Sequence, residues 1–258
     1  MHIKAAGKSH IGKVRDANQD AFFVSLQGPL PLNNLFVVAD GLGGHSAGDV
    51  ASKRALGAFC DFINKTNENI VKNSEGTVCA FEDIMAEALV FANLEVHEQS
   101  VSNENYKGMG TTFSAAVINK ENNCLHYVHV GDSRIYLVDD EGIKQVTADH
   151  SNVTADMVEK GFISVVEAKK YPRVVLSRAI GTDEEVTIDK GTADIKEGVK
   201  YILLCSDGLT NMLDDEQIFE VFKTKEDVDG LCERLVQGAL NAGGLDNISV
   251  IVIGWGCE

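Results

Sequence analysis

Residues 36 to 49 read FVVADGLGGHSAGD, an apolar run that stops on an acid and continues into three glycines within four residues. Such a run, bounded by turn residues, is typical of a buried β-strand. The carboxylate of Asp40 at its tip therefore needs a partner, whereas a neutral turn residue in the same place would need none. Residues 47–64 follow with apolar positions spaced by three and four, which predicts a helix. The stretch thus predicts a strand, an acidic tip and a tight turn into a helix.

The pattern of an acid beside an apolar run recurs at three other places. YILLCSDGL ends a run on Asp207 and Gly208, and HYVHVGDSR delivers Asp132 after another. GGLDNISVIVI places Asp246 just before the last apolar run. A single Asp-Gly after a strand is most often an ordinary turn. Four acids that each adjoin an apolar run instead favour a shared site.

The order of the predicted elements favours a mainly antiparallel α+β fold. Eight segments have the composition and boundaries of strands, namely 21–26, 35–39, 112–118, 124–130, 134–138, 186–195, 200–205 and 248–253. Helical periodicity comes in two pairs, at 47–64 and 80–101 and at 215–222 and 226–239. Several strands follow one another through short turns, without strict strand–helix alternation. The polar segment 150–181 is interpreted as an insertion with short helical stretches at 153–160 and 165–170.

The bulk composition is that of one globular domain. The chain has 258 residues, 44% of them hydrophobic, and no linker, low-complexity tract or repeat divides it, so we expect a single domain over 1–258. No apolar run approaches the roughly 20 residues that span a bilayer, and no N-terminal stretch resembles a signal peptide. Six scattered cysteines without a Cys-x-x-Cys pair favour a reducing compartment. We expect a cytoplasmic monomer that does not bind membranes.

The charge balance disfavours nucleic acid and anionic lipid as partners and suggests divalent cations. The formal net charge is −16, from 39 acidic and 23 basic residues, and such a surface repels nucleic acid and anionic lipid. An acidic excess is usually a solvated surface, but some of these acids could converge on cations. Carboxylates crowded at an apolar edge repel one another unless a proton or a cation relieves them, and Mn²⁺ or Mg²⁺ suits oxygen ligands. A glycine after the acid permits unusual dihedrals and lets a backbone carbonyl approach such an ion.

The N-terminal stretch GKVRDANQD, residues 12–20, adds a base to these acids. Arg15 has a planar guanidinium that suits two oxygens of a phosphate, although it could equally be an ordinary surface base. GLGGHS has the spacing of neither the dinucleotide-binding nor the phosphate-loop fingerprint. A phosphate site built on arginine and cations is therefore favoured over a nucleotide-binding loop.

Eight stretches occur in order along the chain: VRDANQD, VVADGLGGHSAGDVAS, GMGTTFSAAVI, HVGDSRIYL, TADHS, LSRAIG, LLCSDGL and DNISVIV. Together they resemble the motifs of the metal-dependent serine/threonine protein phosphatases, the protein phosphatase 2C family, in their compact bacterial form. The resemblance runs from about residue 7 to residue 253. It implies a four-layer α-β-β-α sandwich, in which two antiparallel β-sheets are flanked by helix pairs. It also implies that segment 150–181 is a flap that influences the choice of substrate.

The resemblance implies a centre of two Mn²⁺ or Mg²⁺ ions. Asp40 would bridge both ions, the carbonyl of Gly41 would bind one of them, and Asp207 and Asp246 would bind the other. In bacterial members a third ion is held by the residues that match Asp132 and Asp207. Two cations about 3.5 to 4 Å apart lower the pKa of a bridging water, which could then attack phosphorus in line.

The implied activity is hydrolysis of phosphoserine and phosphothreonine in proteins, as the counterpart of a bacterial Ser/Thr kinase. Arg15 would hold the phosphoryl oxygens, and no nucleophilic side chain would be required. Two alternatives stay open. One is a catalytically silent member that binds phosphoproteins or senses a signal. The other is a metal-dependent phosphodiesterase or nuclease, which the charge of −16 disfavours.

The chain departs from its eukaryotic relatives at two positions. Gln19 stands where they have a glutamate that helps to hold a metal, so Asp20 would support the metal shell through hydrogen bonds. Leu42 stands where they have a histidine that is a candidate general acid. His45 could supply the proton instead, or it could simply lie near a helix start capped by Ser46.

Overall fold

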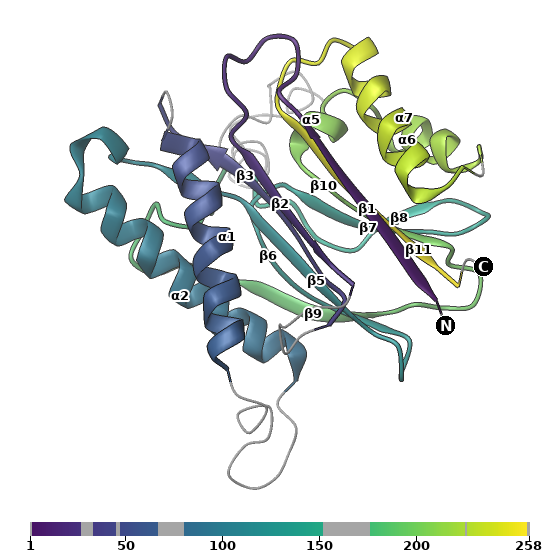
Figure 1. Ribbon diagram of the computed structural model, residues 1–258, viewed down its shortest axis with the longest axis horizontal. Coiled ribbons are helices and arrows are strands. Elements are labelled where there is room, and N and C mark those ends of the chain that lie inside the picture. The colour runs from purple at the N-terminus through teal and green to yellow at the C-terminus, as the bar shows by residue number, and fades with distance from the viewer. Residues whose placement is uncertain are drawn as a thin grey trace, which may run out of the picture.

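The computed structural model describes residues 2–26, 33–44, 47–66, 80–151, 176–224 and 226–256. Two β-sheets lie face to face, and a pair of helices covers the outer face of each (Figure 1). Every strand pair in these sheets is antiparallel. The predicted four-layer α-β-β-α sandwich is therefore confirmed.

The strand order in both sheets is set by pairing between segments distant in sequence. The first sheet contains, in spatial order, β1 (Ile3–His10), β11 (Ile248–Trp255), β10 (Tyr201–Cys205), β7 (Arg134–Val138) and β8 (Ile143–Gln145). The second contains β2 (Asp20–Ser25), β3 (Leu35–Leu42), β5 (Phe113–Asn119), β6 (Cys124–Val130) and β9 (Asp189–Asp194), and β4 (Gly110–Thr111) pairs with the end of β3.

The helices belong to the two outer layers. Helices α1 (Ala47–Lys65) and α2 (Phe81–Ser102) cover the second sheet, followed by a short 3₁₀ turn, η1 (Glu104–Tyr106). Helices α6 (Asp215–Phe222) and α7 (Val228–Asn241) cover the first sheet, and α5 (Asp207–Thr210) is a single turn after β10. A capping box starts α6, because Asp214 accepts from the backbone N–H of Gln217 while the side chain of Gln217 accepts from that of Asp214.

The central strands are apolar on both faces because they lie in the two middle layers. In β3, Phe36 and Val38 point between the sheets, whereas Val37 points toward α1. In β11, Ile251 points between the sheets and Val250 toward α7. Side chains alternate along a strand, so a strand covered on both faces reads as a continuous apolar run.

Most predicted elements are found, several with their predicted bounds, but three strands were not predicted. Strands β1, β4 and β8 are short or only half-buried and lack an apolar run. The predicted helical stretches 153–160 and 165–170, and most of the predicted flap 150–181, lie outside the described residues. Within the described ranges, no helix is both long and apolar enough to cross a bilayer.

Candidate active site

The predicted acids meet at one end of the two sheets because of strand direction. Asp207 follows β10 and Asp246 precedes β11, and these two strands are antiparallel neighbours. In the facing sheet, Asp20 at the start of β2 is the register partner of Asp40 near the end of β3. The chain therefore brings four carboxylates from separate motifs to the same edge.

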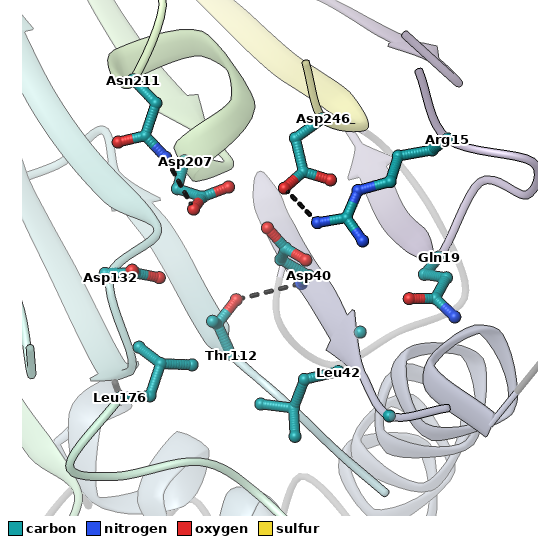
Figure 2. Close-up of a pocket in the computed structure, with 12 residues that line it drawn as sticks. Arg15, Gln19, Asp40, Leu42, Thr112, Asp132, Leu176, Asp207, Asn211 and Asp246 are labelled. Atoms are coloured by element: carbon teal, nitrogen blue, oxygen red, sulfur yellow. Dashed lines mark hydrogen bonds and ion pairs between the residues drawn. The ribbon is translucent and has the colours of Figure 1, made fainter. Parts of the chain in front are cut away.

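A cavity of about 430 Å³ opens at this edge. It is lined by Arg15, Gln19, Asp40, Gly41, Leu42, Gly43, Thr112, Asp132, Leu176, Asp207, Asn211 and Asp246. Figure 2 shows Asp207, Asp246 and Arg15 in the upper part of the view around the central Asp40, with Asp132 beside Leu176 at the left and Leu42 below. Except for Asp20 and His45, every residue predicted for the site lines the cavity. Asp20 is buried beside it, and His45 lies outside the described residues.

The backbone of Asp40 is held by the segment that enters β5. Its N–H donates to Thr112 Oγ1 over 3.0 Å, and its carbonyl accepts from the N–H of Thr112 over 2.8 Å. The hydroxyl of Thr111 donates to the same carbonyl over 2.9 Å. These bonds fix the strand end so that the carboxylate faces the cavity. Sequence reasoning missed Thr112, although it lies within the stretch GMGTTFSAAVI.

The glycines after Asp40 and Asp207 are required by close backbone approach. The prediction of unusual dihedrals is wrong for Gly41, which continues β3 and has no positive φ. A Cβ on Gly41 would lie 2.0 Å from the carbonyl oxygen of Gly48 in α1. A Cβ on Gly208 would lie 1.9 Å from the carbonyl oxygen of Asn247. Both Asp-Gly pairs therefore mark places where another main chain passes against the acid's neighbour.

The surroundings of the cavity disfavour the charged form of the carboxylates that line it. Burial raises the pKa of Asp40 well above its usual value, and the nearby charges of Asp20 and Asp207 raise it further. Burial likewise raises the pKa of Asp20 to about 6 and that of Asp132 to about 7. The pKa of Asp207 is also raised, again mainly by burial. The site thus holds more negative charge than its protein surroundings stabilise.

The hydrogen bonds of these carboxylates leave oxygens for another ligand. Asp207 Oδ2 accepts from Asn211 Nδ2, and Asp20 Oδ2 accepts from the hydroxyl of Ser206, each over 2.9 Å. The Oδ1 atoms of both aspartates are buried and accept no hydrogen bond. A buried carboxylate oxygen without a donor is costly, and a hard cation would satisfy it.

The donor set fits divalent cations, although it is not assembled around one point. No three His, Cys, Asp or Glu side chains in the described part of the chain are already arranged as a metal site. Asp246 is turned toward Arg15, which donates from Nη2 to Asp246 Oδ2 over 2.7 Å. When bound, a divalent cation would offset the mutual repulsion of these carboxylates.

The loop that carries Arg15 is clamped by Asn247, which sequence reasoning missed. The side-chain oxygen of this buried residue accepts from the N–H of Gln19 over 2.8 Å. Its amide nitrogen donates to two further carbonyls of the loop, over 2.8 and 2.9 Å. The hydrogen bond from Arg15 to Asp246 raises the pKa of the guanidinium, which therefore stays charged. The Asp-Asn pair before β11 is the only sequence signal for this clamp.

The turn that carries Asp132 is tied to the base of segment 150–181. Gly131, with φ +110°, donates its N–H to His150 Nδ1 over 3.1 Å, and its carbonyl accepts from the N–H of His150. Because that Nδ1 accepts, the neutral ring carries its hydrogen on Nε2, 3.0 Å from Asp189 Oδ2. Arg178 donates to the other oxygen of Asp189. A chain of polar contacts therefore connects this segment to the cavity.

The two departures noted in the sequence both lie at the cavity. Leu42 lines the cavity and pairs with Gly110 of β4. The carbonyl of Gln19 accepts from the N–H of Gly41 over 3.1 Å and from the hydroxyl of Ser52 over 2.6 Å. Gln19 thus helps to position the strand end of Gly41 through its main chain.

Comparison with known proteins agrees with this geometry. A family model described as protein phosphatase 2C matches residues 6–237. Protein phosphatase PhpP of Streptococcus pneumoniae serotype 2 (strain D39 / NCTC 7466) is 34% identical over 246 residues, which cover 94% of each chain. The crystal structure of serine/threonine phosphatase Stp1 from Staphylococcus aureus matches with a TM-score of 0.84 and 28% identity, over 100% of this chain and 96% of that one.

A further solved structure bears on the cations. The catalytic domain of the serine/threonine protein phosphatase PstP, in complex with two manganese ions, matches with a TM-score of 0.76 and 30% identity. The match covers 98% of this chain and 97% of that one. From the family model and the relatives of at least 30% identity, this chain belongs to the protein phosphatase 2C family.

Proposed function

We propose that this protein hydrolyses phosphoserine and phosphothreonine in proteins at a centre of divalent cations, Mn²⁺ or Mg²⁺. The observation that carries the proposal is the cavity itself, where carboxylates with raised pKa values surround one space and an arginine stands at its edge. Similarity to named Ser/Thr phosphatases supports the same substrate class.

The residues that would hold two ions are those at the strand ends. Asp40 would bridge them, the carbonyl of Gly41 would complete one, and Asp207 and Asp246 would complete the other. Asp132 would hold a third ion together with Asp207. When bound, such cations supply Lewis-acid activation of water near neutral pH and neutralise charge on the phosphoryl group.

Arg15 would bind the phosphoryl group of the substrate. Its contact with Asp246 uses one of the five N–H donors of the guanidinium, so further donors can bind two phosphate oxygens. The Asn247 clamp would hold the loop of Arg15 at a constant distance from the carboxylates. Leu42 and Leu176, which also line the cavity, would pack against the aliphatic part of the phosphorylated side chain.

None of the described residues is assigned as the donor of the proton that the leaving oxygen takes up. Leu42 lacks a titratable group, and we retain His45 as the candidate general acid. A His45→Ala variant tests it: the acid–base limb of the pH–rate profile should shift, and an unchanged profile would remove His45 from the mechanism.

Release of phosphate from a phosphothreonine peptide tests the function. Turnover with Mn²⁺ should be abolished by a chelator and should fall by about 100-fold or more in Asp40→Asn and Asp246→Asn. The control is Glu104→Gln, a carboxylate that is 90% exposed and lies outside the cavity, which should keep wild-type turnover. Intact turnover in both aspartate variants would contradict the assignment.

The same assay separates the alternatives. A silent phosphoprotein-binding member would retain the peptide without releasing phosphate, and a phosphodiesterase would instead cleave a diester substrate. We infer that the phosphoproteins come from a cognate Ser/Thr kinase, because such an enzyme forms these monoesters, and that the phosphatase acts as a monomer within one domain spanning residues 1–258.

A further inference from the structure

His150 is a buried residue that holds the turn of Asp132 through both its main chain and its ring. Its backbone N–H donates to the carbonyl of Gly131 over 2.7 Å, and its ring Nδ1 accepts from the N–H of Gly131 over 3.1 Å. Both polar groups of the residue just before Asp132 are therefore bound by one neighbour.

The position of the Asp132 carboxylate depends on this turn. The carboxylate is hydrogen-bonded by its own backbone N–H, so its direction follows the main chain around it. Gly131 has φ +110°, a conformation that favours glycine, and a Cβ there would lie 2.6 Å from Thr112 Cβ. The main chain of Gly131 thus fits closely against Thr112 and sets where the carboxylate lies.

The other flank of Asp132 is held from the segment that enters β5. Ser133 Oγ lies 2.6 Å from Thr112 Oγ1. The same Oγ1 accepts from the backbone N–H of Asp40 over 3.0 Å. This hydroxyl therefore fixes one flank of Asp132 relative to Asp40, and the flank that precedes Asp132 is left to His150.

The ring of His150 is oriented through its other nitrogen. Nε2 lies 3.0 Å from Asp189 Oδ2, and Arg178 donates to the other oxygen of Asp189 over 2.7 Å. A histidine that a carboxylate binds at one nitrogen is fixed in tautomer and direction. With its hydrogen on Nε2, the ring keeps Nδ1 as the acceptor for Gly131.

The main-chain bonds of His150 do not depend on its side chain. Its carbonyl accepts from the N–H and from the hydroxyl of Ser177, over 2.9 and 3.1 Å. Ser177 follows Leu176, which lines the cavity. Substitution of the His150 side chain therefore keeps these bonds to the cavity wall and removes only the contacts of the ring.

We propose that His150 is a positioning residue for a cation site at Asp132, and that the bond from Gly131 to its Nδ1 sets the affinity of that site for Mn²⁺. This inference rests on the proposed function, which assigns a third ion to Asp132 and Asp207. Loss of a group that orients metal ligands typically weakens metal binding by about 10- to 100-fold. Because Nδ1 acts on Asp132 through one glycine, we expect the lower end of that range.

Mn²⁺ binding to the whole chain, counted from the electron paramagnetic resonance signal of the free ion, tests this without substrate. The wild type should bind one ion more than Asp132→Asn. In His150→Ala the dissociation constant of that ion should rise about tenfold, while the other ions bind as in the wild type. The control is His97→Ala, which removes a partly buried histidine of α2 whose Nδ1 lies 3.3 Å from the carbonyl of Gly181, and it should bind as the wild type.

Two further variants separate the two ring nitrogens, and they decide the matter even if His150→Ala does not fold. An asparagine carries its side-chain oxygen near the position of Nδ1, so His150→Asn should keep wild-type affinity at the Asp132 site. A glutamine reaches the position of Nε2 instead, so His150→Gln should retain the contact with Asp189 and still lose about tenfold. Wild-type affinity in His150→Gln together with a loss in His150→Asn would overturn the role of Nδ1.

The effect must also act through Asp132. In the Asp132→Asn background, His150→Ala should change Mn²⁺ binding no further, and an additional loss there would count against the proposal. Wild-type affinity in His150→Ala, or equal ion counts in the wild type and Asp132→Asn, would refute it. Phosphate release from a phosphothreonine peptide is measured separately: its absence in the wild type would remove the proposed function, whereas the ion counts alone decide the role of His150.

Discussion

Asp20 and Asp40 lie directly opposite each other on β2 and β3, so two carboxylates share one rung of an antiparallel ladder. Like charges in this arrangement destabilise a sheet, and burial raises the pKa of both groups. Ser206 donates to Asp20, and Thr112 holds the backbone of Asp40, but neither bond neutralises a charge. The pairing of these two carboxylates is thus unfavourable in free energy, and only a cation or a proton can neutralise their charge.

Neutralising Asp40 should stabilise the metal-free protein. Metal-free Asp40→Asn should unfold about 2 to 6 °C above the metal-free wild type, because the repulsion with Asp20 and Asp207 is removed. Added Mn²⁺ should raise the unfolding temperature of the wild type much more than that of the variant. Thermal unfolding with and without the metal measures both effects, and Glu104→Gln is the control. Equal Mn²⁺ shifts in wild type and variant would count against Asp40 as a ligand.

Substitution of Gly41 tests the close approach between β3 and α1. Gly41→Ala should lower the free energy of unfolding by about 3 kcal/mol or more, because its Cβ would meet the carbonyl of Gly48 at 2.0 Å. Gly57→Ala is the matched control, since Gly57 lies within α1 with no atom within 4 Å of the added Cβ. That control should gain up to about 1 kcal/mol from helix propensity. Urea unfolding measures the free energy of unfolding of both variants, and similar changes in the two would refute the steric argument.

Loss of the Asn247 clamp should affect both stability and substrate binding. Asn247→Ala removes three hydrogen bonds to the loop of Arg15 and should cost about 2 to 4 kcal/mol of unfolding free energy. The KM for a phosphopeptide should rise, since the loop no longer holds Arg15 at the cavity. Asn241→Ala, at the exposed end of α7, is the control. An unchanged KM in a folded Asn247→Ala protein would show that the clamp is structural only.

The buried His129 should make stability depend on pH. Burial, and to a lesser extent the neighbouring His150, lowers its pKa to about 4. Nε2 lies 3.1 Å from the carbonyl of Ala148, and Nδ1 lies 2.9 Å from the hydroxyl of Ser114, so both ring nitrogens have a polar neighbour in the core.

The sign follows from the lowered pKa. Below about pH 6.5 the unfolded chain binds a proton at this position, while the folded protein does not until about pH 4, so stability is lost as pH falls through this window. Relative to His129→Gln, the wild type should lose about 2 kcal/mol between pH 7 and pH 5. Urea unfolding at several pH values tests this, and parallel pH profiles for the two proteins would contradict it.

The sequence by itself determined the architecture and most of the residues at the cavity. Continuous apolar runs such as 35–39 and 248–253 predicted strands buried on both faces, and acids beside them predicted an acidic strand edge. These signals are local, because period and turn chemistry act over a few residues. They placed Asp40 and Asp207 together correctly, while their roles as metal ligands stay predictions.

Only the tertiary structure decided what holds those acids in position. The clamp of Asn247 on the loop of Arg15, the bond from Gly131 to His150 and the approach of Gly48 to Gly41 join segments from different motifs. Such contacts depend on which strands pair and how closely two main chains approach, and no periodicity encodes either. Thus the apolar pattern determines the layers, while long-range polar and steric contacts determine the geometry of the site.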